Sequence, residues 1–168
     1  MAKRKKKHEI ELYPYETFKT LFEYEIRRSR RYNDPVTLVR LAVETENGGA
    51  EPQHGAEVFT INILDVHLRD VDIPCRVGNE FLVLMPCTDE LSGRVVCERL
   101  ESFFRLESEV YEKVSLKLNV FIGMISLPSN KSLSSKRLME GASRALEHAR
   151  TNQQTKTVVF SDINQPKE

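Results

Sequence analysis

The sequence predicts an α+β domain of the ferredoxin-like type, in which helices pack on one face of a mainly antiparallel, five-stranded sheet. Two observations lead to this prediction. Segments with helical and strand-like hydrophobic spacing alternate in the order helix, strand, helix, hairpin, helix, strand, helix, strand. Two short apolar runs also flank the turn sequence Gly78-Asn79-Glu80, which is typical of an antiparallel hairpin. The 168 residues fit one such domain.

The first half of the chain is expected to place one buried strand between two helices. Residues 15–32 carry apolar side chains at helical spacing, and Asn33-Asp34-Pro35 ends that helix. Residues 36–43 are almost uniformly apolar, which predicts a buried strand. A polar, glycine-containing loop is expected over residues 44–55, followed by a second helix over 56–69.

The second half is expected to contribute the hairpin, two further helices and two further strands. Short apolar or alternating runs predict the strands, at residues 73–77, 81–85, 114–125 and 157–160. Thr88 is the expected N-cap of a helix that runs to about residue 106. Ser134 or Ser135 is expected to cap the last helix, which runs to about residue 151.

The domain is assigned to residues 12–163, with a disordered basic tail at 1–11 and a C-terminal tail at 164–168. Lys+Arg and Asp+Glu are 25 each, so the net charge says nothing about a polyanionic partner, and no nucleic-acid partner is expected. The basic residues nevertheless cluster at 3–7 and at 27–31. The first cluster is expected to be a solubilising tail, the alternative being contact with nucleic acid or an anionic lipid surface. No apolar run reaches the length of a membrane span.

The cysteine pattern and the missing motifs narrow the function classes. Cys75, Cys87 and Cys97 show no C-x-x-C spacing, which argues against a zinc site, fits a reducing, cytoplasmic compartment and predicts three small buried hydrophobic side chains. A phosphate loop, a dinucleotide fingerprint and a zinc-protease helix are all missing from the sequence. The histidines are scattered and are expected to be surface or packing residues: His8, His54, His67 and His148.

The segment from Arg69 to Pro86 resembles the signature hairpin of GGDEF domains, the diguanylate cyclase family. That hairpin has the pattern R-x-x-D, five residues, G-G-[DE]-E-F and an apolar strand that ends in proline. Arg69, Asp72 and the turn Gly78-Asn79-Glu80-Phe81 match this pattern in part. Four further landmarks occur in the family's order, at residues 25–32, 97–100, 122–124 and 142–150. The resemblance covers residues 15 to 160 and implies the palm-like fold of nucleotidyl cyclases.

Members of that family condense two GTP molecules into cyclic di-GMP, and the resemblance implies metal-binding carboxylates at positions that this chain fills differently. Ala42 stands where the first-strand carboxylate is expected and has no ligand oxygen, while Glu44 matches the second carboxylate of that strand. The signature turn is one residue short, Asn79 stands in place of the second metal carboxylate, and only Glu80 remains acidic.

Nucleotide recognition departs from the family pattern as well. Residues 45–55 are shorter than the family's guanine-binding loop, and His54 falls where the final aspartate of that loop is expected. Arg150 replaces the phosphate-binding lysine, and Gln154 replaces a later arginine. The resulting expectation is a degenerate, catalytically inactive domain without a metal or cofactor, and therefore not an enzyme.

Arg69 and Asp72 match an intact R-x-x-D, which in the family is the product-inhibition site for cyclic di-GMP. An arginine fork can pair with phosphate or with the Hoogsteen edge of guanine, and an aspartate can accept hydrogen bonds from guanine N1–H and the exocyclic amine. Arg99 matches a further arginine that some relatives contribute from the following helix. The alternative is structural: Arg69 stabilises a helix C-terminus, and Asp72 forms a surface ion pair with Arg69 or Arg76.

These observations predict a cytoplasmic, bacterial signal-transduction domain that acts as a receptor for cyclic di-GMP, with Arg69, Asp72 and Arg99 as ligand-binding residues. The ligand commonly binds such sites as a stacked dimer that can cross-link subunits, so a homodimer is one expected assembly. The alternative is a ligand-independent interaction module, which docks a signalling protein through the helix around residues 18–32 or through the basic tail. An enzyme with an altered substrate is a third class, and Ala42 and Asn79 count against it.

Overall fold

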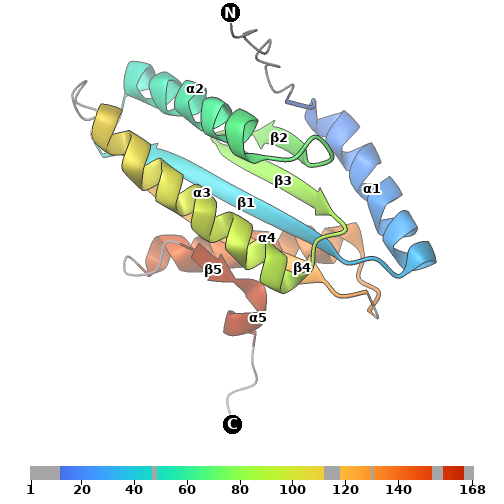
Figure 1. Ribbon diagram of the computed structural model, residues 1–168. Helices are drawn as coiled ribbons and strands as arrows, with labels where there is room; N and C mark the ends of the chain where they lie inside the picture. Colours follow the sequence, from blue (N-terminus) through green and yellow to red (C-terminus); the bar gives the residue numbers. More distant parts are fainter. Residues whose placement is uncertain (1–11, 47–48, 112–117, 130, 153–156, 165–168) are drawn as a thin grey trace, which may run out of the picture.

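The computed structural model describes residues 12–46, 49–111, 118–129, 131–152 and 157–164 (Figure 1). Its helices are α1 (Tyr15–Tyr32), α2 (Ala50–His67), α3 (Glu90–Tyr111), α4 (Ser135–Thr151) and α5 (Phe160–Ile163). Its strands are β1 (Val36–Thr45), β2 (Ile73–Val77), β3 (Glu80–Pro86), β4 (Leu118–Leu127) and β5 (Thr157–Val159). The predicted tail at 1–11, which contains the basic cluster at 3–7 and His8, lies outside the described residues, as do residues 165–168.

The strands form one five-stranded sheet in the order β2-β3-β1-β4-β5. Neighbouring strands are antiparallel except for β4 and β5, which pair in parallel. The sheet is therefore mixed, and the prediction of an α+β fold with a mainly antiparallel sheet is confirmed. The parallel pair arises because the whole of α4 lies between β4 and β5 in the chain, and a crossover of that kind returns the second strand in the same direction.

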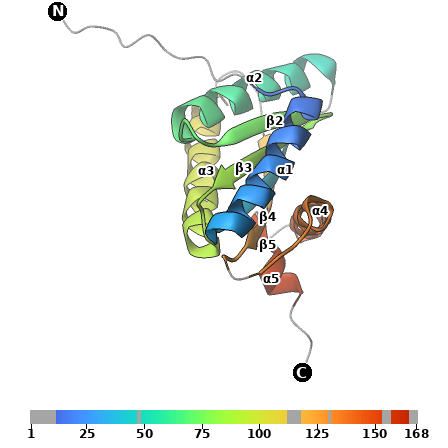
Figure 2. The same cartoon turned by 90° about the vertical axis from the view of Figure 1, so that its right-hand side faces the viewer.

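The expectation that helices cover only one face of the sheet is wrong. Viewed along the sheet, α2 and α3 lie on one face and α1 and α4 lie on the other (Figure 2). The central strand β1 explains this arrangement, because its alternate side chains enter two separate hydrophobic cores. Val39, Leu41 and Val43 pack in the core beneath α2 and α3. Val36 and Leu38 pack in the core beneath α1 and α4.

Several predicted boundaries differ from the observed ones. Helix α2 begins at Ala50, six residues before the predicted start at residue 56, because Pro52 falls in the first helical turn, where its missing N–H is tolerated. Helix α3 continues to Tyr111, and Asp89 caps it in place of Thr88 by accepting a hydrogen bond of 2.8 Å from the Ser92 backbone N–H. Strand β4 runs from Leu118 to Leu127, and the predicted positions 114–117 lie outside the described residues.

The predicted hairpin is confirmed, with a tighter turn than the family pattern. Val77 pairs with Glu80, so Gly78 and Asn79 are the two central residues of the turn. Gly78 has φ of 60°, the left-handed conformation that the first position of a type II′ hairpin turn requires. Glu80 is therefore the first residue of β3, where it pairs with Val77 of β2 and with Ala42 of β1.

Among the described residues, no helix combines the length and the apolar character that crossing a membrane requires. Two of the three cysteines are buried as predicted, Cys75 and Cys97, and burial raises the pKa of the Cys97 thiol to about 12. Cys87 is exposed, which corrects the prediction for that residue.

Replacement of Gly123 by alanine is expected to lower the free energy of unfolding by about 1–3 kcal/mol, or to prevent folding. Gly123 lies in β4 directly against α4, and an added Cβ would stand 2.3 Å from the Leu146 backbone nitrogen and 2.6 Å from the Ala142 carbonyl oxygen. Urea denaturation followed by circular dichroism measures the effect. The control is Arg137→Ala, because this side chain of α4 is exposed and its removal should change stability by less than about 0.5 kcal/mol. A Gly123→Ala protein as stable as wild type would contradict this close packing.

Candidate functional site

The R-x-x-D segment forms a closed turn between α2 and β2. The Arg69 backbone N–H donates to Asp72 Oδ2 at 2.8 Å, and the Asp72 backbone N–H donates to the Arg69 carbonyl at 3.0 Å. The Arg69 guanidinium also donates to Asp72, from Nη2 to Oδ1 at 2.8 Å and from Nε to Oδ1 at 3.2 Å. The structure thus brings the two predicted ligand-binding residues together, as one charge-assisted pair.

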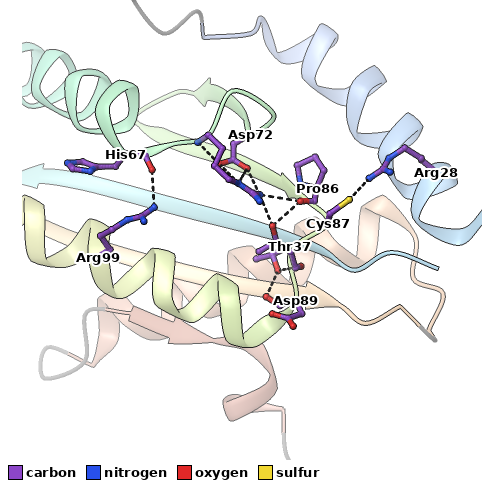
Figure 3. Close-up of polar contacts among 10 residues, drawn as sticks. Arg28, Thr37, His67, Asp72, Pro86, Cys87, Asp89 and Arg99 are labelled. Atoms are coloured by element: carbon purple, nitrogen blue, oxygen red, sulfur yellow. Dashed lines mark hydrogen bonds and ion pairs between the residues drawn. The ribbon is translucent and has the colours of Figure 1, made fainter. Parts of the chain in front are cut away.

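The guanidinium of Arg69 is held at one edge and open at the other. Its Nη2 also donates to Thr88 Oγ1 at 2.8 Å and to the Pro86 carbonyl at 3.2 Å, which fixes it against the junction between β3 and α3 (Figure 3). The Asp72 side chain is only 3% exposed, whereas the Arg69 side chain is 50% exposed. The hydrogen bond to Asp72 raises the pKa of Arg69 above its ordinary value, so this group remains cationic.

Arg99 borders the same connection from α3. Its Nη2 donates to the carbonyl of His67, the last residue of α2, at 3.0 Å (Figure 3). A cation at this position stabilises the negative end of the α2 dipole. The structural role expected of Arg69 at a helix C-terminus therefore falls to Arg99, because α2 ends two residues before Arg69.

The predicted ion pair between Asp72 and Arg69 is confirmed, but the expectation that Asp72 lies at the surface is corrected. Asp72 is buried and pairs with Arg69. Arg76 lies in the hairpin instead, where its guanidinium donates to Glu57 Oε1 at 2.6 Å and to the Gly78 carbonyl at 2.8 Å. Sequence analysis missed Thr88 as a member of this site, because a threonine just before a helix is first interpreted as an N-cap.

A second polar cluster adjoins the same junction on its other side. Cys87 follows β3 and has φ of 50°, an uncommon conformation for a residue with a side chain. Arg28 of α1 donates to Cys87 Sγ at 3.0 Å (Figure 3). It also donates to Asp34 Oδ2 at 3.1 Å. These contacts tie α1 to the end of β3, which also carries the carbonyl that accepts from Arg69.

A different site lies at the opposite end of β3, beside the hairpin turn. A cavity of about 410 Å³ is lined there by Asn79, Glu80, Arg40 and Arg150, among others. Glu80 accepts hydrogen bonds from Arg40 Nε at 2.5 Å and from Arg150 Nη2 at 2.8 Å. Arg150 also donates to Glu44 Oε1 at 3.1 Å. A charged residue in the middle of the apolar run 36–43 was the signal that could have identified Arg40 from the sequence.

The two arginines determine the charge state of Glu80. Burial alone would raise the pKa of this carboxyl, but the hydrogen bonds and charges of Arg40 and Arg150 outweigh burial and hold the pKa below its usual range. Both carboxylate oxygens of Glu80 are occupied by guanidinium groups. A divalent cation at Glu80 would compete with two guanidinium groups for the same carboxylate oxygens. Within the described segments, no group of three or more histidine, cysteine, aspartate or glutamate side chains is arranged to hold a metal ion.

Some of the positions at which this chain departs from the GGDEF pattern lie at this cavity, and others lie away from it. Ala42 is buried in β1 and pairs directly with Glu80 across the sheet, and Asn79 and Arg150 line the cavity. His54 lies on α2 with its side chain exposed, and its Nδ1 is 3.8 Å from Glu57. Gln154 lies outside the described residues.

Comparison with known proteins identifies the fold. Neither the family models nor the curated proteins compared with the chain match its sequence. The GGDEF domain of DgcB from Caulobacter crescentus in complex with c-di-GMP is similar over 96% of this chain and 99% of that chain, with a TM-score of 0.71 and 14% identity. The active GGEEF domain of a diguanylate cyclase from Vibrio cholerae is similar over 84% and 92%, with a TM-score of 0.71 and 15% identity.

A third similar structure is the diguanylate cyclase SiaD in complex with its activator SiaC from Pseudomonas aeruginosa, with a TM-score of 0.69 and 20% identity over 88% of this chain and 58% of that chain. At these identities the likeness establishes the fold. The chain has the palm-like fold of GGDEF domains, and the resemblance inferred from the hairpin is confirmed at that level.

The expectation that the chain is not an enzyme is wrong. The Vibrio cholerae domain with the same fold is an active GGEEF domain, and the other structures include a diguanylate cyclase bound to its activator. The chain therefore shares its fold with catalytically active domains. The departures at Ala42 and Asn79 do not exclude enzymatic activity.

The substitution Glu80→Gln is expected to lower the free energy of unfolding by about 1–3 kcal/mol at pH 7, because it removes a charged acceptor from two partly buried guanidinium groups. The pKa of Glu80 is lower in the folded chain than in the unfolded chain. Ionised Glu80 therefore stabilises the fold above its unfolded pKa, and that stabilisation is lost as the pH falls through the folded pKa. The difference between variant and wild type should shrink between pH 6 and about pH 3.

Chemical denaturation across that pH range measures the effect, with Glu147→Gln as the control. Glu147 also pairs with Arg150, at 2.5 Å, but its side chain is 67% exposed, so its removal should change stability by less than about 0.5 kcal/mol. An equal loss for Glu80→Gln at pH 3 and pH 7 would exclude the ionic origin of the effect.

Proposed function

We propose that this chain is a signalling domain that binds cyclic di-GMP through Arg69, Asp72 and Arg99. The observation that supports this proposal most directly is the state of the Arg69 guanidinium. Asp72 and Thr88 clamp one edge of it, and half of the side chain remains exposed to solvent. A cation held in one orientation loses little further freedom when a ligand binds it.

The open edge of Arg69 fits the acceptors of a cyclic dinucleotide. Its hydrogen bonds use Nε and Nη2, and Nη1 makes none to the residues that the structure describes. Guanine presents two acceptors, O6 and N7, on one edge, and each phosphate presents two more oxygens. A planar guanidinium recognises both kinds of acceptor, which an ammonium group does less specifically.

Asp72 places a structural requirement on this mode of binding. Both of its oxygens already accept hydrogen bonds from Arg69, and its side chain is nearly buried. Guanine N1–H and the exocyclic amine can reach Asp72 only after the Arg69 side chain has moved away from it. In the absence of that movement, Asp72 acts as the residue that positions Arg69.

Arg99 supplies a second cation at the edge of the same connection. Its Nη2 is engaged by the His67 carbonyl, and the rest of its guanidinium makes no hydrogen bond within the described part of the chain. It can assist Arg69 in the same subunit or in a neighbouring one of a homodimer. The GGDEF domain of DgcB, which has this fold, is in complex with c-di-GMP, and this supports the choice of ligand. The setting that we propose is a bacterial, cytoplasmic signalling system.

Isothermal titration calorimetry with cyclic di-GMP tests the proposal. We expect wild type to bind with a dissociation constant in the micromolar range, and Arg69→Ala to bind at least about tenfold more weakly, a loss of about 1.4 kcal/mol or more. Arg69→Lys should lose a similar amount, because lysine keeps the charge but not the fork. Arg99→Ala should lose severalfold.

The control is Arg76→Ala, which removes an exposed arginine from the neighbouring strand without touching the site. It should bind as wild type does. Circular dichroism verifies that each variant is folded. No binding by folded wild type at tens of micromolar ligand would refute the proposal, and so would equal binding by Arg69→Ala.

A further inference from the structure

Helices α1 and α4 lie on the face of the sheet opposite α2 and α3 (Figure 2). A groove between these two helices is lined by residues that belong to neither polar site. Its volume is about 570 Å³, larger than that of the cavity beside the hairpin. The exposed apolar surface comes from Tyr15 of α1, which is 37% exposed, and from the partly buried Met139 of α4, while Phe18 and Phe22 of α1 lie buried beneath them. This lining is mainly carbon and offers little to a small polar ligand.

The rim of the groove is basic. Lys19 and Arg27 of α1 and Lys136 of α4 line it, and all three are exposed. Arg27 and Lys136 form no ion pair with any residue in the described ranges. The acidic side chain in the groove, Glu23, already accepts a hydrogen bond from the Ser135 hydroxyl. Lys19 pairs with Glu16, whose side chain is 82% exposed, and water screens an exposed pair of this kind strongly. The rim therefore presents an excess of positive charge.

The walls of the groove restrict the backbone of an occupant. Both walls are helices, and helices satisfy the backbone hydrogen bonds of their interior residues internally. An extended peptide would find no backbone partners there and would bury its own N–H and C=O groups unpaired. A helical segment brings its backbone already satisfied and presents only side chains to the groove.

We infer that this groove docks an acidic amphipathic helix of a partner protein. The apolar face of that helix packs between α1 and α4, and its Asp and Glu side chains meet Lys19, Arg27 and Lys136. The stretch of α1 from Tyr15 to Arg27 is about 18 Å long at the helical rise of 1.5 Å per residue, so the docked helix spans about three turns. Its apolar residues recur at positions i, i+3 or i+4, and i+7.

This inference is independent of cyclic di-GMP binding and gives a definite chemistry to the predicted alternative of a partner docked through α1. Charge complementarity selects the partner: a basic or neutral helix would bring like charges together or leave the rim cations unmatched. A second copy of this chain fits less well, because α1 itself carries basic residues on its exposed positions, Lys19, Arg27, Arg30 and Arg31.

Fluorescence anisotropy with three synthetic peptides tests the inference on the full chain. The first is a fluorescein-labelled, 15-residue helix with leucine on one face and glutamate elsewhere. The second carries lysine in place of each glutamate, and the third has the composition of the first in scrambled order. We expect the first peptide to bind in the range of tens of micromolar and the other two to bind at least about tenfold more weakly. Binding of the first should also weaken as salt is raised.

Charge reversal locates the binding site. The double variant Arg27→Glu and Lys136→Glu should weaken binding of the acidic peptide at least about tenfold, while Arg105→Glu, an exposed residue on α3 across the sheet, should not change it. Circular dichroism verifies that the variants are folded. Equal binding of the three peptides, an equal loss for Arg105→Glu, or no binding by wild type would overturn the inference. The inference would also be overturned if sedimentation velocity showed that wild type is a dimer and that the double variant is a monomer.

Discussion

The register of the central strand β1 fixes both ends of β3, beside which the two polar sites lie. β1 pairs with β3 on one side and with β4 on the other, and its side chains alternate between two hydrophobic cores. That register places Ala42 opposite Glu80 at one end of β3 and Val36 opposite Pro86 at the other. A slip of one residue would reverse the direction of every side chain on the strand, so the apolar pattern itself holds the register.

The two ends of β3 carry polar sites of different construction. At the Pro86 end, Arg69 and Asp72 lie three residues apart and satisfy each other through a local turn, and Thr88 and the Pro86 carbonyl complete the clamp. At the Glu80 end, one carboxylate accepts from two arginines on separate elements, β1 and α4. The first site leaves a cation half exposed for a ligand. In the second, guanidinium groups already occupy both oxygens of the acid.

The proposed cyclic di-GMP site and the proposed docking groove lie on opposite faces of the sheet, because helices cover both faces. Helices α2 and α3 form one layer and α1 and α4 the other (Figure 2). The R-x-x-D turn follows α2 and Arg99 lies on α3, whereas the basic groove is lined by α1 and α4. Arg28 of α1 also donates to Cys87, the residue between Pro86 and Thr88, and so connects α1 to the junction that holds Arg69. A ligand that moved Arg69 would act on the segment that α1 holds. The two surfaces are therefore separate in space but share one junction.

The sequence by itself determined the features that depend on neighbours along the chain. The helix at 15–32 followed from apolar spacing and the Asn33-Asp34-Pro35 stop, and the hairpin followed from the glycine at its turn, because both are local conformational preferences. The Arg69–Asp72 pair was predictable for the same reason, since three residues of chain separate the partners. The residues at Ala42 and Asn79, in contrast, led to the prediction that the chain is not an enzyme. The fold that the chain shares with an active GGEEF domain overturned that prediction.

Only the tertiary structure decided which distant groups meet. Glu80 finds Arg40 and Arg150 at separations of 40 and 70 residues, and Arg99 finds the carbonyl of His67 at 32. The two-sided helix layers, the early start of α2 and the groove between α1 and α4 also depended on packing. Such contacts depend on sheet register and on which face each helix covers, and these are settled by the burial of the whole apolar surface at once.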